Sequence, residues 1–188
     1  MSISLVLDSF LNVVGELDVD SLSPILKRDS DTVEIRKADF KTVIHPAHPK
    51  SAPDHILLQG RLARNGAPAS IAFRSASKSI DDIGVRWTVT GTKGEIEITA
   101  NRGQWQIESG SKKLRIRLYE SGEVREFGVD PAELGVASTL GDLSVNTALI
   151  IDGFTTGDKD SFVDFAESLK IHKLLDAILA KSGYLSTV

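Results

Sequence analysis

Cysteine is absent from this chain of 188 residues, and methionine occurs once. Without cysteine there can be no disulfide, no thiolate nucleophile and no cysteine-based zinc site. This composition fits a reducing compartment, and we expect a cytoplasmic protein. No apolar run reaches the roughly 18 residues of a membrane-spanning helix, and no basic segment precedes the apolar N-terminus as in a signal peptide. We therefore expect no membrane partner.

Clustered basic residues are also missing. The chain has 22 Lys and Arg against 26 Asp and Glu, a formal charge of −4, and no basic block. A protein that binds nucleic-acid backbones needs clustered cations, so no nucleic-acid partner is predicted. The glycine-rich dinucleotide turn, the phosphate-binding loop and the G-x-S-x-G elbow are absent as well. The sequence therefore contains none of these three cofactor and nucleophile motifs.

Three segments have the periodicity of helices. Apolar residues recur at helical spacing over residues 2–14, and Gly15 is placed to end that helix. Two further helices are predicted at 142–153, capped by Asp142, and at 162–182, capped by Asp160 or Ser161. Five residues of the last helix lie on one mainly apolar stripe: Phe165, Leu169, His172, Asp176 and Leu179.

Between these helices the period changes to two. Alternating apolar and polar residues predict strands at 55–62, 69–74, 85–90, 95–99, 104–107 and 113–118, after two strands near 21–27 and 32–36. The segment 44–53 has three prolines and is predicted to be an irregular loop. The pattern favours an α+β fold, a large, mostly antiparallel open sheet with helices packed on one face. We expect a single domain over residues 1–188.

The polar face of the predicted sheet supplies the candidate site. It collects His55, Gln59, Arg61, Ser70, Arg74, Arg86, Thr88, Gln104, Gln106, Arg115 and Arg117. Arginine suits bidentate anion recognition and protein interfaces, so this face is either an ordinary solvated surface or a site for a partner or a polar ligand. We predict His55, Arg74 and Asp8 as catalytic residues and Gln59, Arg61 and Arg86 as substrate-binding residues.

Histidines supply two weaker candidates. His45, His48 and His55 lie near Asp54, but rigid prolines separate them and no known ligand spacing matches, so no metal site is predicted. His172 and Asp176 are four residues apart on the last helix. They could form a general base with its orienting carboxylate. We favour a buried, hydrogen-bonded packing pair.

Two long segments and both ends of the chain resemble a known family. APDHILLQGRLARNGAPASIAFR and RWTVTGTKGEIEIT are similar to the second domain of the Gfo/Idh/MocA oxidoreductases, closest to the fungal, galactose-repressor-like branch. The ending SFVDFAESLKIHKLLDAILAKS resembles the closing helix of that family. The opening SLVLDSFLNVVGEL resembles the helix that carries its D-x-G-x-H-x-x-D motif. The resemblance covers about Ser4 to Ser182.

The resemblance implies a partner domain that this chain does not contain. Family members bind NAD(P) in an N-terminal Rossmann domain, hold substrate between their two domains, and usually dimerise through the open sheet. Their catalysis uses a lysine of an E-K-P motif in the first domain and the motif histidine of the second. Asp8 here aligns with the last motif aspartate, and Leu5 stands at the histidine position. We therefore expect no cofactor and no dehydrogenase activity.

Two hypotheses of function follow. The start at Met1 within a helix, with Leu5 at the catalytic position, favours a stand-alone gene over a fragment of a longer protein. The first hypothesis is a cofactor-independent protein with a pocket for a small-molecule ligand, a repurposed isomerase or cyclase of fungal secondary metabolism. The alternative is a non-catalytic dimeric or regulatory interaction module, which forms a homodimer through its open sheet face.

Overall fold

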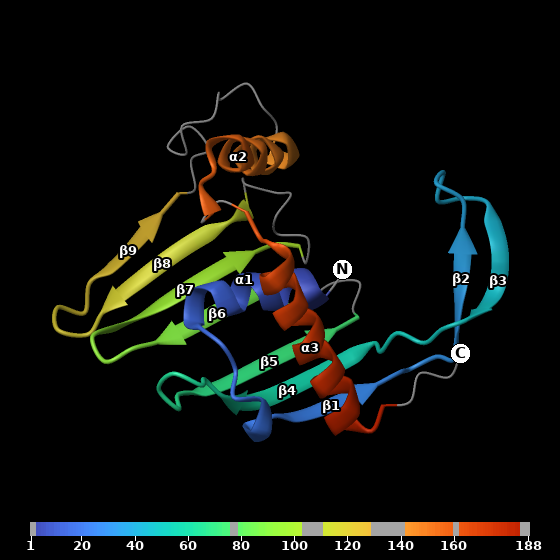
Figure 1. Ribbon diagram of the computed structural model, residues 1–188, viewed down its shortest axis with the longest axis horizontal. Helices are drawn as coiled ribbons and strands as arrows, with labels where there is room; N and C mark the ends of the chain where they lie inside the picture. Colours follow the sequence, from blue (N-terminus) through green and yellow to red (C-terminus); the bar gives the residue numbers. More distant parts are fainter. Residues whose placement is uncertain (1–2, 76–78, 103–110, 129–141, 160–161, 185–188) are drawn as a thin grey trace. The chain divides into compact units, whose positions relative to one another are not determined.

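The computed structural model describes residues 3–75, 79–102, 111–128, 142–159 and 162–184 (Figure 1). The chain divides into two compact units. The terminal unit comprises residues 2–75 and 165–188, and the central unit comprises residues 76–164. Among the described residues, no helix is long and apolar enough to cross a membrane.

The terminal unit combines two helices with a three-stranded sheet. Its helices are α1 (Ile3–Val14) and α3 (Phe165–Ser182), and the short 3-10 helix Val19–Ser21 follows α1. The sheet has the antiparallel order β1-β4-β5 and contains β1 (Ser23–Lys27), β4 (His55–Arg61) and β5 (Pro68–Arg74). Gly15 ends α1 as predicted, with a φ of 95° and a 2.8 Å hydrogen bond from its N–H to the Leu11 carbonyl.

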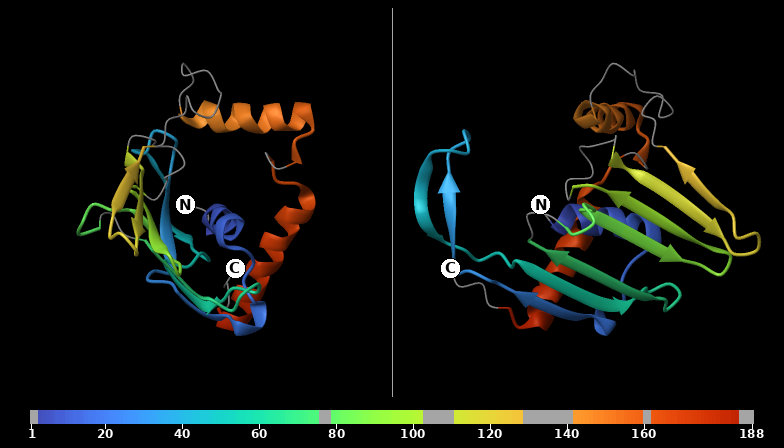
Figure 2. Two further views of the ribbon diagram at one scale, coloured as in Figure 1. Left: turned by 90° about the vertical axis from the view of Figure 1, so that its left-hand side faces the viewer. Right: turned by 180° about the vertical axis from the view of Figure 1, so that it is seen from behind.

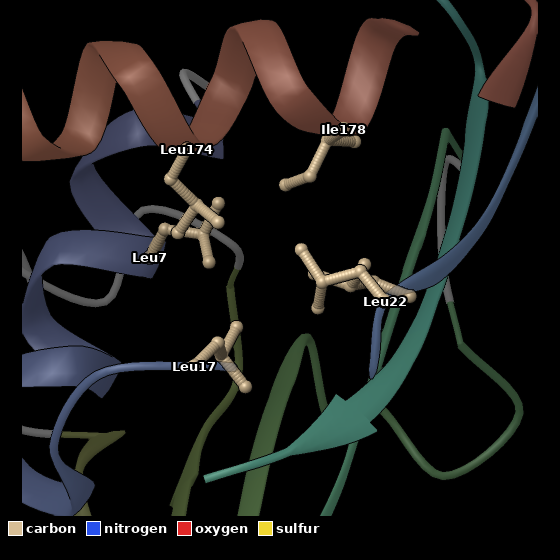
Figure 3. Packing of buried hydrophobic residues seen from close by; sticks show 6 residues of the cluster. Leu7, Leu17, Leu22, Leu174 and Ile178 are labelled. Atoms are coloured by element: carbon tan, nitrogen blue, oxygen red, sulfur yellow. The ribbon is translucent and has the colours of Figure 1, made fainter. Parts of the chain in front are cut away.

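The core of the terminal unit lies between the helices and one face of this sheet. It contains Leu7 of α1, Leu58 of β4, Leu174 and Ile178 of α3, and the connecting residues Leu17 and Leu22 (Figure 3). Leu7 and Leu58 are each only 1% exposed. Both helices therefore cover the face of the sheet to which Leu58 belongs (Figure 2).

The mainly apolar stripe of α3 that the sequence shows is not the side that packs on the sheet. Phe165 is 96% exposed, Leu169 53% and Leu179 42%, whereas Leu174 and Ile178 are buried. Apolar residues occur on two sides of this helix, so helical periodicity alone does not determine which side packs. The predicted buried pair of His172 and Asp176 is wrong, because both residues are exposed.

A two-stranded ribbon extends the terminal unit. It consists of β2 (Thr32–Arg36) and the antiparallel β3 (Val43–Pro49), and we call it the arm (Figure 1). The prediction of an irregular loop at 44–53 is thus wrong for β3. Pro49 pairs with Thr32, and Pro46 lies at an irregularity between His45 and His48. Both strands of a two-stranded ribbon are edge strands. Proline is tolerated in an edge strand because the side of the strand that faces away from its partner needs no backbone N–H donor.

Among its described residues, the central unit contains a four-stranded antiparallel sheet and one helix. The sheet has the order β6-β7-β8-β9 and contains β6 (Val85–Thr90), β7 (Gly94–Ala100), β8 (Lys113–Leu118) and β9 (Val124–Phe127). The helix is α2 (Asp142–Thr156). The sequence did not predict β9, and the strand predicted at 104–107 lies outside the described residues, as do the predicted caps Asp160 and Ser161.

The α+β class is confirmed, with antiparallel sheets as predicted. The described strands form three hydrogen-bonded sheets, where the sequence led us to expect one continuous meander. The prediction of a single domain stays a prediction, beside the two compact units described above.

Candidate functional site

Four of the six predicted site residues share one exposed sheet face. Leu58 belongs to the buried face of β4, so His55, Gln59 and Arg61 lie on the opposite face because side chains alternate along a strand. Arg74 of β5 is in register with His55. We call this surface the open face of the terminal sheet. Whether these residues bind a substrate stays a prediction.

The other two predicted site residues do not belong to the open face. Asp8 is half-buried on α1, which packs on the Leu58 side of the sheet. Asp8 and His55 therefore lie on opposite sides of the sheet, and a direct acid–base pair would need an approach of about 3 Å. Arg86 belongs to β6 of the central unit.

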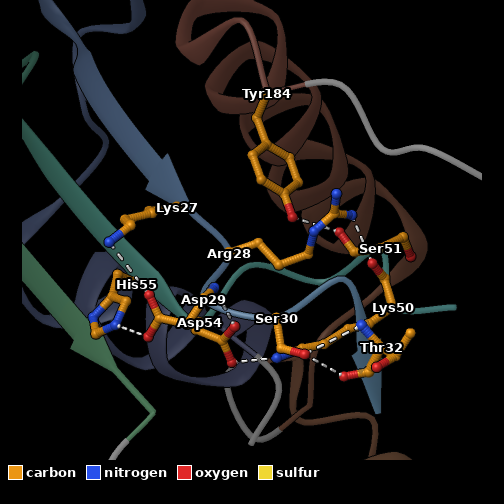
Figure 4. A network of polar contacts seen from close by, with 10 residues as sticks. All are labelled: Lys27, Arg28, Asp29, Ser30, Thr32, Lys50, Ser51, Asp54, His55 and Tyr184. Carbon is orange, nitrogen blue, oxygen red and sulfur yellow. Dashed lines mark hydrogen bonds and ion pairs between the residues drawn. The ribbon is translucent and has the colours of Figure 1, made fainter. Parts of the chain in front are cut away.

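His55 forms a hydrogen bond with an aspartate that was not among the predicted site residues. Its Nε2 lies 2.6 Å from Oδ2 of Asp29, the second residue after β1 (Figure 4). This hydrogen bond lowers the pKa of Asp29, with a further contribution from Lys27 at 3.5 Å. The pairing of Lys27 with His55 in the β1–β4 register brings Asp29 to this place. The imidazole is therefore hydrogen-bonded within a network of charged side chains.

The same network holds the base of the arm. The Asp54 carboxylate accepts a 2.9 Å hydrogen bond from the Asp29 N–H and pairs with Lys50, which lowers the pKa of Asp54. Arg28 donates to the Lys50 carbonyl at 2.6 Å, and the Tyr184 hydroxyl donates to the Ser51 carbonyl at 2.7 Å (Figure 4). We call Arg28, Asp29, Lys50, Asp54 and Tyr184 the root cluster.

Asp29 gives the terminal unit a testable acid dependence. Its pKa is lowered in the folded state, so its stabilising effect is present above the unfolded pKa of about 3.9 and is lost as the pH falls through the lower folded pKa. We expect Asp29→Asn to lower the urea midpoint at about pH 5 and to have a smaller effect at about pH 3. In a His55→Ala background this pH-dependent difference should shrink, and an unchanged difference would contradict the role of the pair.

The arginines of the central sheet are neutralised by acidic neighbours. Arg86 lies 3.1 Å from Asp81 and 3.6 Å from Glu97, and Arg115 also pairs with Glu97, which raises the pKa of Arg115. The register aligns Thr88, Glu97, Arg115 and Glu126 across the four strands. The positive charge that we inferred for this face from its arginines is therefore largely balanced. Gln104 and Gln106 lie outside the described residues.

An aliphatic row crosses the open face of the terminal sheet. Ile25, Leu57 and Ala72 are in register on β1, β4 and β5, and Ile25 is 62% exposed and Leu57 46%. Polar rows flank it on both sides: Lys27, His55 and Arg74, and Ser23, Gln59 and Ser70. This row was not predicted, although the run Ile56-Leu57-Leu58 is apolar on both faces of β4. This row is an uncovered apolar surface.

The remaining polar candidates do not gather into a site. His45 and His48 are exposed on the arm with ring centroids 5.9 Å apart, while His55 pairs with Asp29 in the other sheet of the terminal unit. No group of three or more potential metal ligands occurs in the part of the chain that the structure describes. Arg61 lies 3.4 Å from Asp18, whose side chain caps the 3-10 helix.

Solved structures share this fold at low sequence identity. Gal80p of Saccharomyces cerevisiae, in a super-repressor mutant, matches with a TM-score of 0.70 and 16% identity over 96% of this chain and 46% of its own. The transcriptional regulator Gal80p of Kluyveromyces lactis matches with 0.68 and 19% identity over 97% and 43%. Levoglucosan dehydrogenase in its apo form matches with 0.69 and 18% identity over 96% and 47%. This chain spans less than half the length of each.

These matches show that the chain shares the α+β fold of the three structures. Residues 2–100 match the family described as Gal80p, C-terminal domain. The chain therefore belongs to the Gal80p C-terminal-domain family. No curated protein matches the chain.

Proposed function

We propose that this chain is a non-catalytic interaction module whose open face binds a second copy of the chain. The observation that carries the proposal is the exposed aliphatic row of Ile25, Leu57 and Ala72. A solvated face of an antiparallel sheet is normally polar along its whole width. An apolar centre with a charged and polar rim is the usual composition of a protein interface.

The layout of the open face suits a two-fold dimer. In such a dimer the same patch is used by both copies, so the two aliphatic rows meet at the centre. The rim then brings Lys27 and Arg74 of one copy near polar or acidic residues of the other. Among these, Asp29 follows β1 and Asp18 pairs with Arg61 at the end of β4. Rim charges of this kind set the orientation of the partner more than the affinity.

The comparisons support a regulatory role for this module. Two of the similar structures are Gal80p proteins, one described as a transcriptional regulator and one as a super-repressor mutant. The third is a dehydrogenase whose chain is more than twice as long as the part matched. We assign the present chain to the regulatory use of this fold that the two Gal80p descriptions name.

The proposal predicts that a charge in the aliphatic row separates the dimer. We expect Ile25→Arg to convert a dimer of the wild-type chain to a monomer, because two guanidinium groups would be buried against an apolar row. Sedimentation velocity measures the change. Val124→Arg on β9 is the matched control, since Val124 is 56% exposed on an edge strand of the four-stranded central sheet. A wild-type monomer, or equal effects of both substitutions, would refute the proposal.

The isomerase or cyclase function stays a prediction, as does the link to fungal secondary metabolism. Its proposed catalytic residues are His55, Arg74 and Asp8, of which His55 is hydrogen-bonded to Asp29 and Asp8 lies on the other side of the sheet. No observation among the described residues favours it over the interaction module. Saturable binding of a small molecule that is lost in a His55→Gln variant would revive it.

A further inference from the structure

The charge of the open face lies on one side of its aliphatic row. We call the in-register residues on the side where the arm begins the basic row, and those on the other side the neutral row. The basic row contains Lys27 of β1, His55 of β4 and Arg74 of β5. The neutral row contains Ser23, Gln59 and Ser70 on the same three strands. The two polar rims of the open face therefore differ in charge.

Asp29 reduces the charge of the basic row without cancelling it. Its carboxylate lies 2.6 Å from Nε2 of His55 and 3.5 Å from Nζ of Lys27, at the β1 end of the row (Figure 4). Lys27 and Arg74 are both exposed, and Arg74 belongs to β5, the opposite edge strand of the sheet. Lysine and arginine both stay protonated at neutral pH. One carboxylate thus accompanies two permanent positive charges, and the row as a whole stays positive.

Two copies that stack their aliphatic rows have two choices of two-fold axis. Sheets that pack face to face have strands that are either aligned or nearly perpendicular. Perpendicular strands would make the two rows cross at a single point, so stacked rows require aligned strands. The axis then runs either along the strands or across them, parallel to the aliphatic row. With either axis Leu57, in the middle of the row, faces Leu57 of the second copy.

An axis along the strands brings like charges together. It superimposes each edge of the sheet on the opposite edge of the second copy, so Lys27 of each copy faces Arg74 of the other. His55 then faces His55. Like charges that face each other across an interface are strongly unfavourable. The charge pattern of the open face therefore selects against this axis.

We propose that the two-fold axis of the open-face dimer runs across the strands, so that the basic row of each copy packs on the neutral row of the other. The inference rests on the proposed function and specifies how the second copy is oriented. The facing pairs are Lys27 with Ser23, His55 with Gln59, and Arg74 with Ser70. The hydroxyl and amide oxygens of the neutral row are acceptors for the N–H groups that face them. Symmetry forms each pair twice.

Single cysteines test the axis, because the chain has no cysteine of its own. Each variant is treated with a short thiol-specific crosslinker, and the rate of dimer formation is read from a denaturing gel. We expect Ile25→Cys to crosslink fast and Gln59→Cys slowly. With the proposed axis Ile25 faces Ile25, whereas the two Gln59 residues are about 13 Å apart along the strands. An axis along the strands reverses the order, because Gln59 then faces Gln59 and the two Ile25 residues are about 10 Å apart across the strands.

Leu57→Cys separates failure of the axis from failure of the proposed function. Leu57 faces its counterpart with either axis, so the absence of a Leu57 crosslink contradicts the open-face dimer itself. A Leu57 crosslink together with a Gln59 rate equal to or above the Ile25 rate overturns the proposed axis alone. His172→Cys is the matched control, since His172 is exposed on α3, which covers the other face of the sheet. A His172 rate as high as that of Ile25 would assign the crosslinks to random collision and overturn the proposal.

Arg74→Glu tests the physical cause of the orientation. With this substitution Lys27 faces a carboxylate when the axis runs along the strands. We expect the crosslinking rate of Gln59→Cys to rise about fivefold in this background, the effect of two exposed ion pairs. The rate of Leu57→Cys in the same background should stay unchanged, because Leu57 faces its counterpart with either axis. An unchanged Gln59→Cys rate would show that charge does not select the axis, and this would contradict the proposal.

Discussion

Leu58→Ala is expected to lower the free energy of unfolding by about 2–5 kcal/mol. Leu58 is 1% exposed and joins β4 to Leu7 of α1 and to Leu174 and Ile178 of α3. Truncation removes the transfer free energy of the side chain and leaves a cavity among residues from three elements. Those elements are held by their own hydrogen bonds, so they can close around the cavity only in part. Urea denaturation followed by circular dichroism measures the loss.

Leu57→Ala provides the control at the next position of the same strand. Leu57 belongs to the open face and is 46% exposed, so its truncation should cost less than about 1 kcal/mol in the monomer. Leu57 and Leu58 are adjacent in β4, and their side chains lie on opposite faces of the sheet. The two variants therefore compare the stabilising contribution of the open face with that of the buried face. Equal losses would mean that the open face is covered within one chain, and this would contradict both the fold and the proposed interface.

The secondary structure followed from local pattern over most of the chain. The predicted strand 32–36 matches β2, and the strand 113–118 matches β8 at both ends. Hydrophobic periodicity was sufficient to predict these strands, and the glycine after α1 was sufficient to predict the end of that helix. Local pattern did not predict the structure where an interaction between residues distant in sequence determines it. Proline in β3 is compatible with a strand only because β2 leaves one of its sides open, and the sequence of residues 43–49 does not contain that information.

The candidate site was predicted in part for the same reason. Alternation placed His55, Gln59, Arg61 and Arg74 on one face, and the register brings His55 opposite Arg74. The partner of His55 is Asp29, which stands 26 positions earlier and becomes a neighbour only through the β1–β4 pairing. The arginines of the central sheet were counted without Glu97, although its position in the alternation places it on the same face. Counting the acidic residues of a face together with its basic ones would have corrected that interpretation.

Gly94→Ala is expected to lower the free energy of unfolding by about 1–3 kcal/mol. Gly94 begins β7, in register with Leu118 at the end of β8. A Cβ at this position would collide with the backbone carbonyl oxygen of Arg117, which cannot move without breaking the β7–β8 ladder. The need for glycine here arises from close approach of two backbones, since Gly94 is not among the residues with positive φ. Urea denaturation followed by circular dichroism measures the effect.

Gly91→Ala in the same turn separates this collision from a general preference for glycine. A Cβ on Gly91 would lie 3.5 Å from the Gly94 carbonyl oxygen, an ordinary contact. Its backbone is also free of positive φ, so alanine should be neutral or stabilise by about 0.4–1 kcal/mol through the entropy of the unfolded chain. The two glycines of the G-T-K-G turn therefore have opposite expected effects. A loss at Gly91 as large as that at Gly94 would show that the turn conformation, and not the packing of β7 against β8, requires glycine.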